Sequence, residues 1–160
     1  MTQDLIDAEK IIRERLNYFL MGNQAAIEFC MGCLKLVHFL DDVADGEKIK
    51  PDDVSKAIIN MTWGTLANPF FRAFQDQLLP LLINTGLCWQ DSNVLDHGSE
   101  HDMHISYGLR SAGIQVIAFS AFLLGGNDWA LKVGPDIRRL LIEDLHEYVK
   151  EMEREKEVLE

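Results

Sequence analysis

The chain has 160 residues, 48% of them hydrophobic, and its 26 acidic residues outnumber its 15 basic ones, giving a formal net charge of −11. This length corresponds to one domain whose core needs no disulfide bonds, and the composition is that of a globular rather than a disordered protein. The negative charge disfavours nucleic acids and anionic membranes as partners, because both repel it.

Three features indicate a protein of the cytoplasm. The cysteines, Cys30, Cys33 and Cys88, are too few for a disulfide framework, and the first residues lack the pattern of a secretory signal. The longest weakly polar run, 111–124, is shorter than the roughly 20 residues that a membrane-spanning helix needs. We therefore expect no membrane partner, and we expect the cysteines at 30 and 33 to pack in the core.

Apolar residues recur at helical spacing along most of the chain, and the alternation typical of strands is nearly absent. We predict an all-α fold: a single-domain bundle of about six helices over 1–150, followed by a charged tail over 151–160. The first helix is expected over about 2–20. The second, over about 24–45, is apolar on most sides and is therefore expected to be central.

Proline indicates where the next two helices begin. Pro51 and the pair at 68–69 place proline at a first helical position, where its missing N–H costs nothing. The helix that begins at Pro51 is expected to end near Ala67. The helix that follows is expected to be kinked at Pro80 and to end near Trp89.

A long buried helix is predicted over about 98–124, after a polar stretch at 90–97. The glycine pair at 125–126 should stop this helix, because glycine is the common residue just after a helix end. A last helix is expected from about Asp136.

The acidic end of the second helix is the first candidate site. His38, Asp41, Asp42 and Asp45 recur at helical spacing and share one face. Carboxylates at a helix C-terminus face the negative end of the helix dipole, so a positive group should compensate them. Mg²⁺ or Mn²⁺ would suit clustered carboxylate oxygens and could hold a phosphate or diphosphate. The alternative is an acidic helix end solvated by water.

A second candidate cluster lies at the start of the long helix. Glu100, His101 and His104 are spaced to share a face with Tyr107. Imidazole and carboxylate groups on facing helices build metal centres in bundle proteins, so we expect both clusters to surround one cation. The alternative is a polar helix start with surface histidines.

Arg110 interrupts the apolar run of the long helix, and long charged side chains are seldom buried without a partner. Two roles remain open. Arg110 could form a structural ion pair with Asp41 or Asp42, or it could bind a substrate phosphate next to Tyr107.

Two resemblances bear on function. The stretch 29–45, FCMGCLKLVHFLDDVAD, resembles the first aspartate-rich helix of squalene and phytoene synthases, which implies Asp41, Asp42 and Asp45 as Mg²⁺ ligands and a prenyl diphosphate as substrate. The wider layout, from DDVAD through NPFFR and HISYGLRSA to GGNDWALKVGPDIRR, is similar to small phage-encoded helical proteins of unassigned function. The second resemblance implies a host cytoplasm.

Three hypotheses follow. The first is a Mg²⁺- or Mn²⁺-dependent enzyme of diphosphate or nucleotide chemistry, with metal-bound water as the nucleophile and Arg110 stabilising charge. The second is a non-enzymatic phage accessory or assembly protein, a homo-oligomer whose Asp–Arg cluster is a structural ion pair. The third is an acidic protein that mimics nucleic acid.

Overall fold

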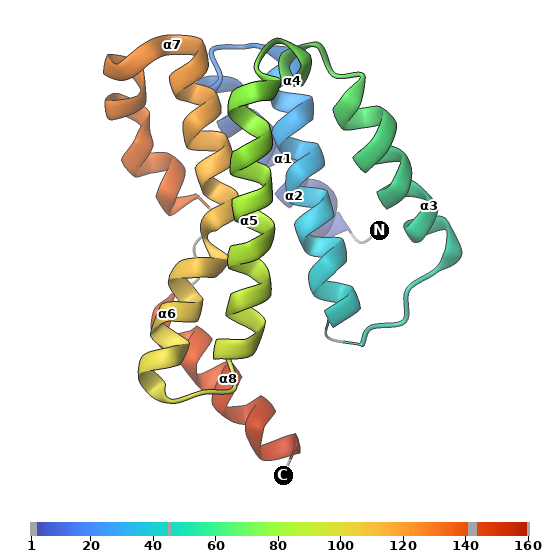
Figure 1. Cartoon of the computed structure of the whole chain (residues 1–160), viewed down its shortest axis with the longest axis vertical. Helices are drawn as coiled ribbons and strands as arrows, with labels where there is room; N and C mark the ends of the chain where they lie inside the picture. The colour runs from blue at the N-terminus through green and yellow to red at the C-terminus, as the bar shows by residue number, and fades with distance from the viewer. Residues whose placement is uncertain (1–2, 45, 141–143, 160) are drawn as a thin grey trace.

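The computed structural model describes residues 3–44, 46–140 and 144–159, and it confirms the all-α, single-domain prediction, with no strand in these ranges. Figure 1 shows helices running mostly up and down the long axis of the molecule. In chain order the elements are α1 (Gln3–Phe19), α2 (Gln24–Ala44), α3 (Pro51–Ile59), the π-helical segment η1 (Asn60–Gly64), α4 (Pro69–Ala73), α5 (Gln75–Leu95), α6 (Glu100–Arg110), α7 (Ala112–Arg139) and α8 (Leu145–Leu159).

The main core gathers around the first half of α2. Phe29 stacks on Phe71 of α4, with ring centroids 5.6 Å apart, and it also contacts Phe70. Asn68 begins α4 as expected, because its side-chain oxygen accepts the backbone N–H groups of Phe70 and Phe71, while its amide donates to Ala25 O of α2. Further buried members come from α1, α2, α5 and α7: Leu16, Phe19, Leu20, Ile27, Cys30, Met31, Leu78, Ile114, Ile117 and Ile137.

The expected long helix consists of α6 and the first half of α7, which are separated at Ser111. Gly126, with φ 71° and ψ −170°, breaks the helical path inside α7, so the predicted stop at the glycine pair becomes a sharp bend. The chain then continues as helix past Pro135 to Arg139, which differs from the expected new start at Asp136.

The boundaries of α5 differ from the prediction at both ends. The break in the helix falls at Phe74 (φ −124°, ψ 25°), and Pro80 lies inside α5. At the other end, α5 runs to Leu95 instead of ending near Trp89, so the polar residues of the expected loop form its last turns. This extension places Asp96 directly at the helix end, facing α6.

The C-terminal helix α8 packs on α6 and includes most of the predicted charged tail. Its buried residues Tyr148 and Met152 join Met103 of α6 in a second, smaller apolar cluster. By length and composition, the stretch Glu100–Arg139 is apolar enough to cross a membrane. This is weak evidence for a span, because core helices pass the same test.

The segment formed by α3, η1 and the two residues that follow, 51–66, is called the α3 arm here. It lies along α2 at one edge of the molecule (Figure 1). Asn60 anchors it, because its side-chain amide donates to the carbonyl of Gly32, 2.8 Å away. A Cβ on Gly32 would come within 2.9 Å of the Asn60 amide oxygen, so glycine permits this close approach. No residue of the α3 arm is buried.

Candidate functional site

The acidic end of α2 is mostly exposed. His38 and Asp42 are solvent-exposed, and Asp45 lies outside the described residues. Asp41 is half-buried and accepts a hydrogen bond from the indole N–H of Trp89, at 2.7 Å. A neutral donor on α5 therefore holds the carboxylate that was predicted to bind a cation.

The second predicted cluster lies on a different part of the molecule. Glu100, His101 and His104 are exposed on α6, which packs on α5, α7 and α8, whereas α2 packs on α1, α3, α4, η1 and α7. Among the described residues, no three His, Cys, Asp or Glu side chains come close enough to share a metal ion. The predicted grouping of both clusters is therefore not formed there, because their helices are not neighbours.

The start of α6 has the features of a polar helix N-terminus. Ser99 and Asp102 form a reciprocal cap, in which the Ser99 hydroxyl accepts the Asp102 backbone N–H and the Asp102 carboxylate accepts the Ser99 backbone N–H. Glu100 and Asp102 lie where the helix dipole favours acids. This cap accounts for part of the acidic pattern without any ligand.

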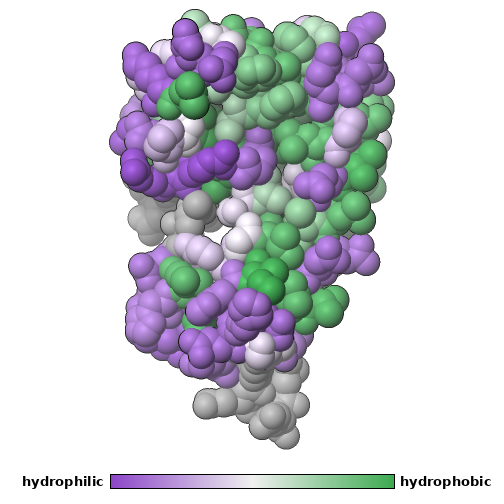
Figure 2. Space-filling view, turned by 60° about the vertical axis from the view of Figure 1, so that its left-hand side comes forward, coloured by the Kyte–Doolittle hydropathy of each residue, from purple (hydrophilic) through white to green (hydrophobic). Residues whose placement is uncertain are grey.

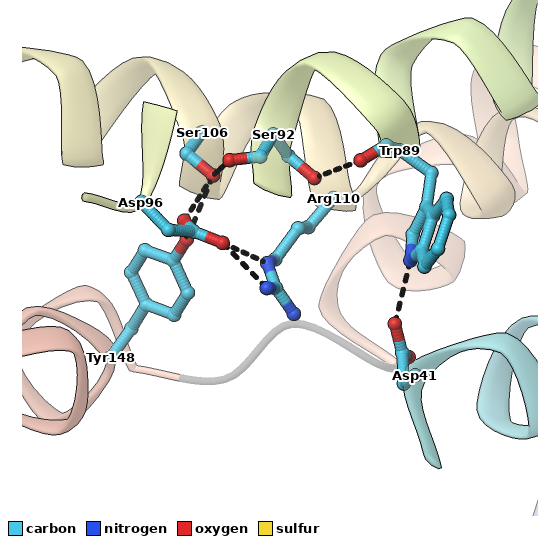
Figure 3. Close-up of polar contacts among 7 residues, drawn as sticks. All are labelled: Asp41, Trp89, Ser92, Asp96, Ser106, Arg110 and Tyr148. Atoms are coloured by element: carbon cyan, nitrogen blue, oxygen red, sulfur yellow. Dashed lines mark hydrogen bonds and ion pairs between the residues drawn. The ribbon is translucent and has the colours of Figure 1, made fainter. Parts of the chain in front are cut away.

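The structure instead builds a buried polar cluster around Asp96 (Figure 3). Asp96 is 2% exposed. One of its carboxylate oxygens accepts the hydroxyl groups of Ser106 and Tyr148, and the other accepts Nη2 of Arg110 at 2.5 Å and Nε at 3.2 Å. We call Asp96, Ser106, Arg110 and Tyr148 the Asp96 cluster; it joins α5, α6 and α8.

Arg110 corrects one prediction, since its ion-pair partner is Asp96 and not Asp41 or Asp42. Burial lowers the pKa of the guanidinium, but the hydrogen bond and charge of Asp96 outweigh burial and raise the pKa above its ordinary value. The charge of Asp41 acts in the same direction. With two acids around it, Arg110 is neutralised locally and offers little attraction to a substrate phosphate.

Tyr107 was predicted to help bind substrate, but its ring lies against that of Tyr148, with centroids 5.4 Å apart. It belongs to the smaller apolar cluster between α6 and α8. Its position is therefore explained by packing of the C-terminal helix.

The chemistry of the Asp96 cluster is that of a structural contact. Burial, followed by the hydrogen bond to Asp96, raises the pKa of Tyr148 to about 12, so its hydroxyl stays protonated and donates. No buried side-chain nitrogen or oxygen among the described residues lacks a hydrogen-bond partner. With both carboxylate oxygens occupied by internal donors, the cluster holds helices together.

A second chain of contacts links this cluster to α2. Ser106 lies 3.0 Å from the carbonyl oxygen of Ser92, and the Ser92 hydroxyl donates to the carbonyl of Trp89, whose indole binds Asp41. Figure 3 shows these residues side by side, from Tyr148 at one end to Asp41 at the other. Polar contacts thus connect α8, α6, α5 and α2.

Sequence reasoning missed Asp96 as the partner of Arg110, and it missed Ser106 and Tyr148 as the hydroxyl donors to Asp96. The available signal was the Gly–Ser pair at 98–99, which ends one helix and caps the next. An antiparallel helix pair around that turn indicates that α6 folds back along the last turns of α5, although the turn alone does not pair position 110 with position 96.

The two thiols of α2 agree with the prediction of core packing. Cys30 and Cys33 are free, and both belong to or pack against the main core. Burial raises the pKa of Cys30 to about 12, so the thiol stays protonated and unreactive.

Comparison of the whole chain with protein-family models, with curated proteins and with solved structures finds no match.

Proposed function

We propose that this chain is a non-enzymatic accessory or assembly protein that acts by associating with a second copy of itself. The Asp96 cluster serves the fold, and exposed helical surfaces serve the association. The proposal places the protein in the cytoplasm, which is the host cytoplasm if a phage encodes it. The observation that carries the proposal is the α3 arm.

The α3 arm exposes several large apolar side chains, and none of its residues is fully buried. Its most exposed large side chain is Trp63, at 75%. The other large apolar side chains that it exposes are Val54, Ile58, Ile59, Met61 and Leu66. They point to several sides of the helix, and a helix that is apolar on several sides is normally covered. Exposed apolar surface of this extent in a folded protein marks an interaction site.

The distribution of charge leaves one part of the surface where a second copy can approach. Two copies that each carry a net charge of −11 repel one another over most of their surface. Residues 57–71 contain no charged side chain, so this part of the surface escapes the repulsion. Association through it buries apolar side chains without placing acid against acid.

The exposed apolar area matches what a dimer needs. A standard interface covers about 800 Å² per copy, of which somewhat more than half, roughly 450 Å², is apolar. A half-exposed aliphatic side chain contributes roughly 30–60 Å² of apolar area, and each Å² removed from water stabilises the interface by about 25 cal/mol. The α3 arm together with four exposed side chains of α5, described below, therefore provides an area of the right size.

Sedimentation equilibrium over a wide range of protein concentration tests the proposal. We expect a mass that rises from monomer to dimer and a melting temperature that rises with concentration, because only the folded state associates. Higher salt should tighten the association by screening the repulsion between copies. A monomer mass at every concentration and salt level would contradict the proposal.

A further inference from the structure

The exposed face of α5 carries a second apolar surface, called the α5 stripe here: Leu79, Ile83, Leu87 and Val94. Their spacing of four, four and seven residues places them on one side of the helix. Leu78 and Ser92 on the opposite side are buried, so the stripe points to solvent. In Figure 2, hydrophobic side chains form a band down the right-hand part of the molecule.

Most of the α5 stripe carries no charge, like residues 57–66 of the α3 arm, although the exposed Asp91 lies between Leu87 and Val94. Residues 77–90 contain no charged side chain. Gly86 lies among the stripe residues, and a Cβ built on it would meet nothing within 4 Å. Glycine inside a helix costs about 1 kcal/mol relative to alanine, and in the part of the chain that the structure describes no contact requires it. The absence of a side chain at Gly86 leaves room for another molecule to approach the helix backbone closely.

Trp63 differs from the other two tryptophans. The indole N–H of Trp89 binds Asp41, and that of Trp129 binds the carbonyl of Phe19. Within the described ranges, the indole N–H of Trp63 has no hydrogen-bond partner, and its ring is the most exposed of the three. A large ring with one polar tip is the kind of side chain that anchors interfaces.

We infer that Trp63 of one copy docks on the α5 stripe of a second copy, and that the contact is repeated in the reverse direction. This inference rests on the proposed self-association and names its interface. Gln90, exposed among the stripe residues, offers a carboxamide oxygen to the indole N–H.

The α3 arm and the α5 stripe lie on elements that both adjoin α2. α2 packs against the α3 arm and is joined to α5 through the bond between Trp89 and Asp41. Figure 1 shows α5 and α3 on either side of α2. A two-fold dimer pairs the arm of each copy with the stripe of the other, so each copy provides both surfaces.

Two substitutions and a matched control test the interface by sedimentation. Trp63→Ala removes the anchor, and Leu87→Asp places a charge in the stripe. Each should raise the dimer dissociation constant at least about tenfold. Ile11→Asp is the control, because Ile11 is exposed to the same degree as Leu87 (56% and 55%) but lies on α1, behind α2 in Figure 1. It should change the constant less than about twofold.

Mixing the two variants gives a sharper result. A mixed dimer keeps one intact contact, between the Trp63 of the Leu87→Asp copy and the stripe of the Trp63→Ala copy. The mixture should therefore associate more tightly than either variant alone, and circular dichroism should show that each variant is folded. If arms pair with arms and stripes with stripes, mixing gives no gain and the inference is wrong.

The outcomes separate this inference from the proposed function. A wild-type chain that stays monomeric contradicts both. A wild-type dimer whose dissociation constant is unchanged by Trp63→Ala and Leu87→Asp contradicts only the interface.

Discussion

The two halves of α2 are both rich in apolar residues, yet only the first half is buried. Ala26, Ile27, Phe29, Cys30 and Met31 all belong to the core. From position 33 to 44, no residue is buried, although this half includes leucine, valine and phenylalanine.

The neighbours of each half explain the difference. The aromatic side chains of α4 close over the first half, where Phe29 contacts Phe70 and Phe71. Around the second half, the structure provides the exposed α3 arm, the hydrogen bond from Trp89 to Asp41 and an ion pair between Lys35 and Glu9 of α1. Apolar composition therefore shows that a surface needs cover, and the neighbouring helices decide whether a single chain supplies it.

The largest expected effect sharpens this contrast directly. We call the buried first half of α2 its closed half and the second half, 33–44, its open half. Phe29→Ala leaves a cavity in the closed half and should lower the free energy of unfolding by about 3–5 kcal/mol. Phe39→Ala, in the open half, removes a partly exposed ring and should cost only about 1 kcal/mol in the monomer. Denaturant unfolding at low protein concentration measures the change in the free energy of unfolding for both variants. Equal changes would show that Phe39 is buried in solution to the same degree as Phe29.

The next effect concerns the polar cluster beside the open half. Arg110→Met leaves the Asp96 carboxylate buried without its cation and should cost about 2–4 kcal/mol. Arg139→Met breaks an exposed pair with Asp136 and should cost less than about 0.5 kcal/mol. Similar losses in the two variants would show that the Asp96 cluster is open to water.

A pH titration tests the same cluster through Tyr148. Its pKa is about 12 in the folded chain against an ordinary 10.0, so the unfolded state loses the proton first. Its contribution to stability is complete below pH 10 and is lost as pH rises to 12, at up to about 1.4 kcal/mol per unit. Tyr148→Phe should flatten the profile in this range, and an unchanged slope in this variant would contradict the prediction.

The smallest expected effect lies at the acidic end of the open half. Millimolar Mg²⁺ or Mn²⁺ should leave the melting temperature unchanged, because Asp42 is exposed and Asp41 is held by Trp89. If the metal raises the melting temperature and this rise disappears in Asp42→Asn, the acidic end of α2 binds a cation and the prediction is wrong.

Local signals in the sequence were sufficient for much of the fold. Pro51 and Asn68 begin helices as predicted, because proline and capping groups act within one turn. Helical spacing also identified α2, but its predicted central place holds only for the first half, where all its buried residues lie.

The partners across helices could not be predicted in the same way. Spacing says which residues share a face, but it does not say which helices are neighbours. Arg110 was expected to pair with Asp41 or Asp42 and pairs with Asp96, because α6 folds back on α5 and not on α2. The prediction that both clusters of metal-capable residues surround one cation likewise required α2 and α6 to be neighbours, which they are not.

The attachment of α8 has a consequence for the order in which the molecule opens. In the described part of the chain, α8 packs on α6, and its buried anchors are Tyr148 and Met152; the hydrogen bond from Tyr148 to Asp96 also ties it to the end of α5. A helix held at one end of the molecule can detach without disturbing the core around Phe29. Amide protons of α8 should therefore exchange with solvent well before those in the first half of α2, and a protease should remove this helix first and leave a folded remainder.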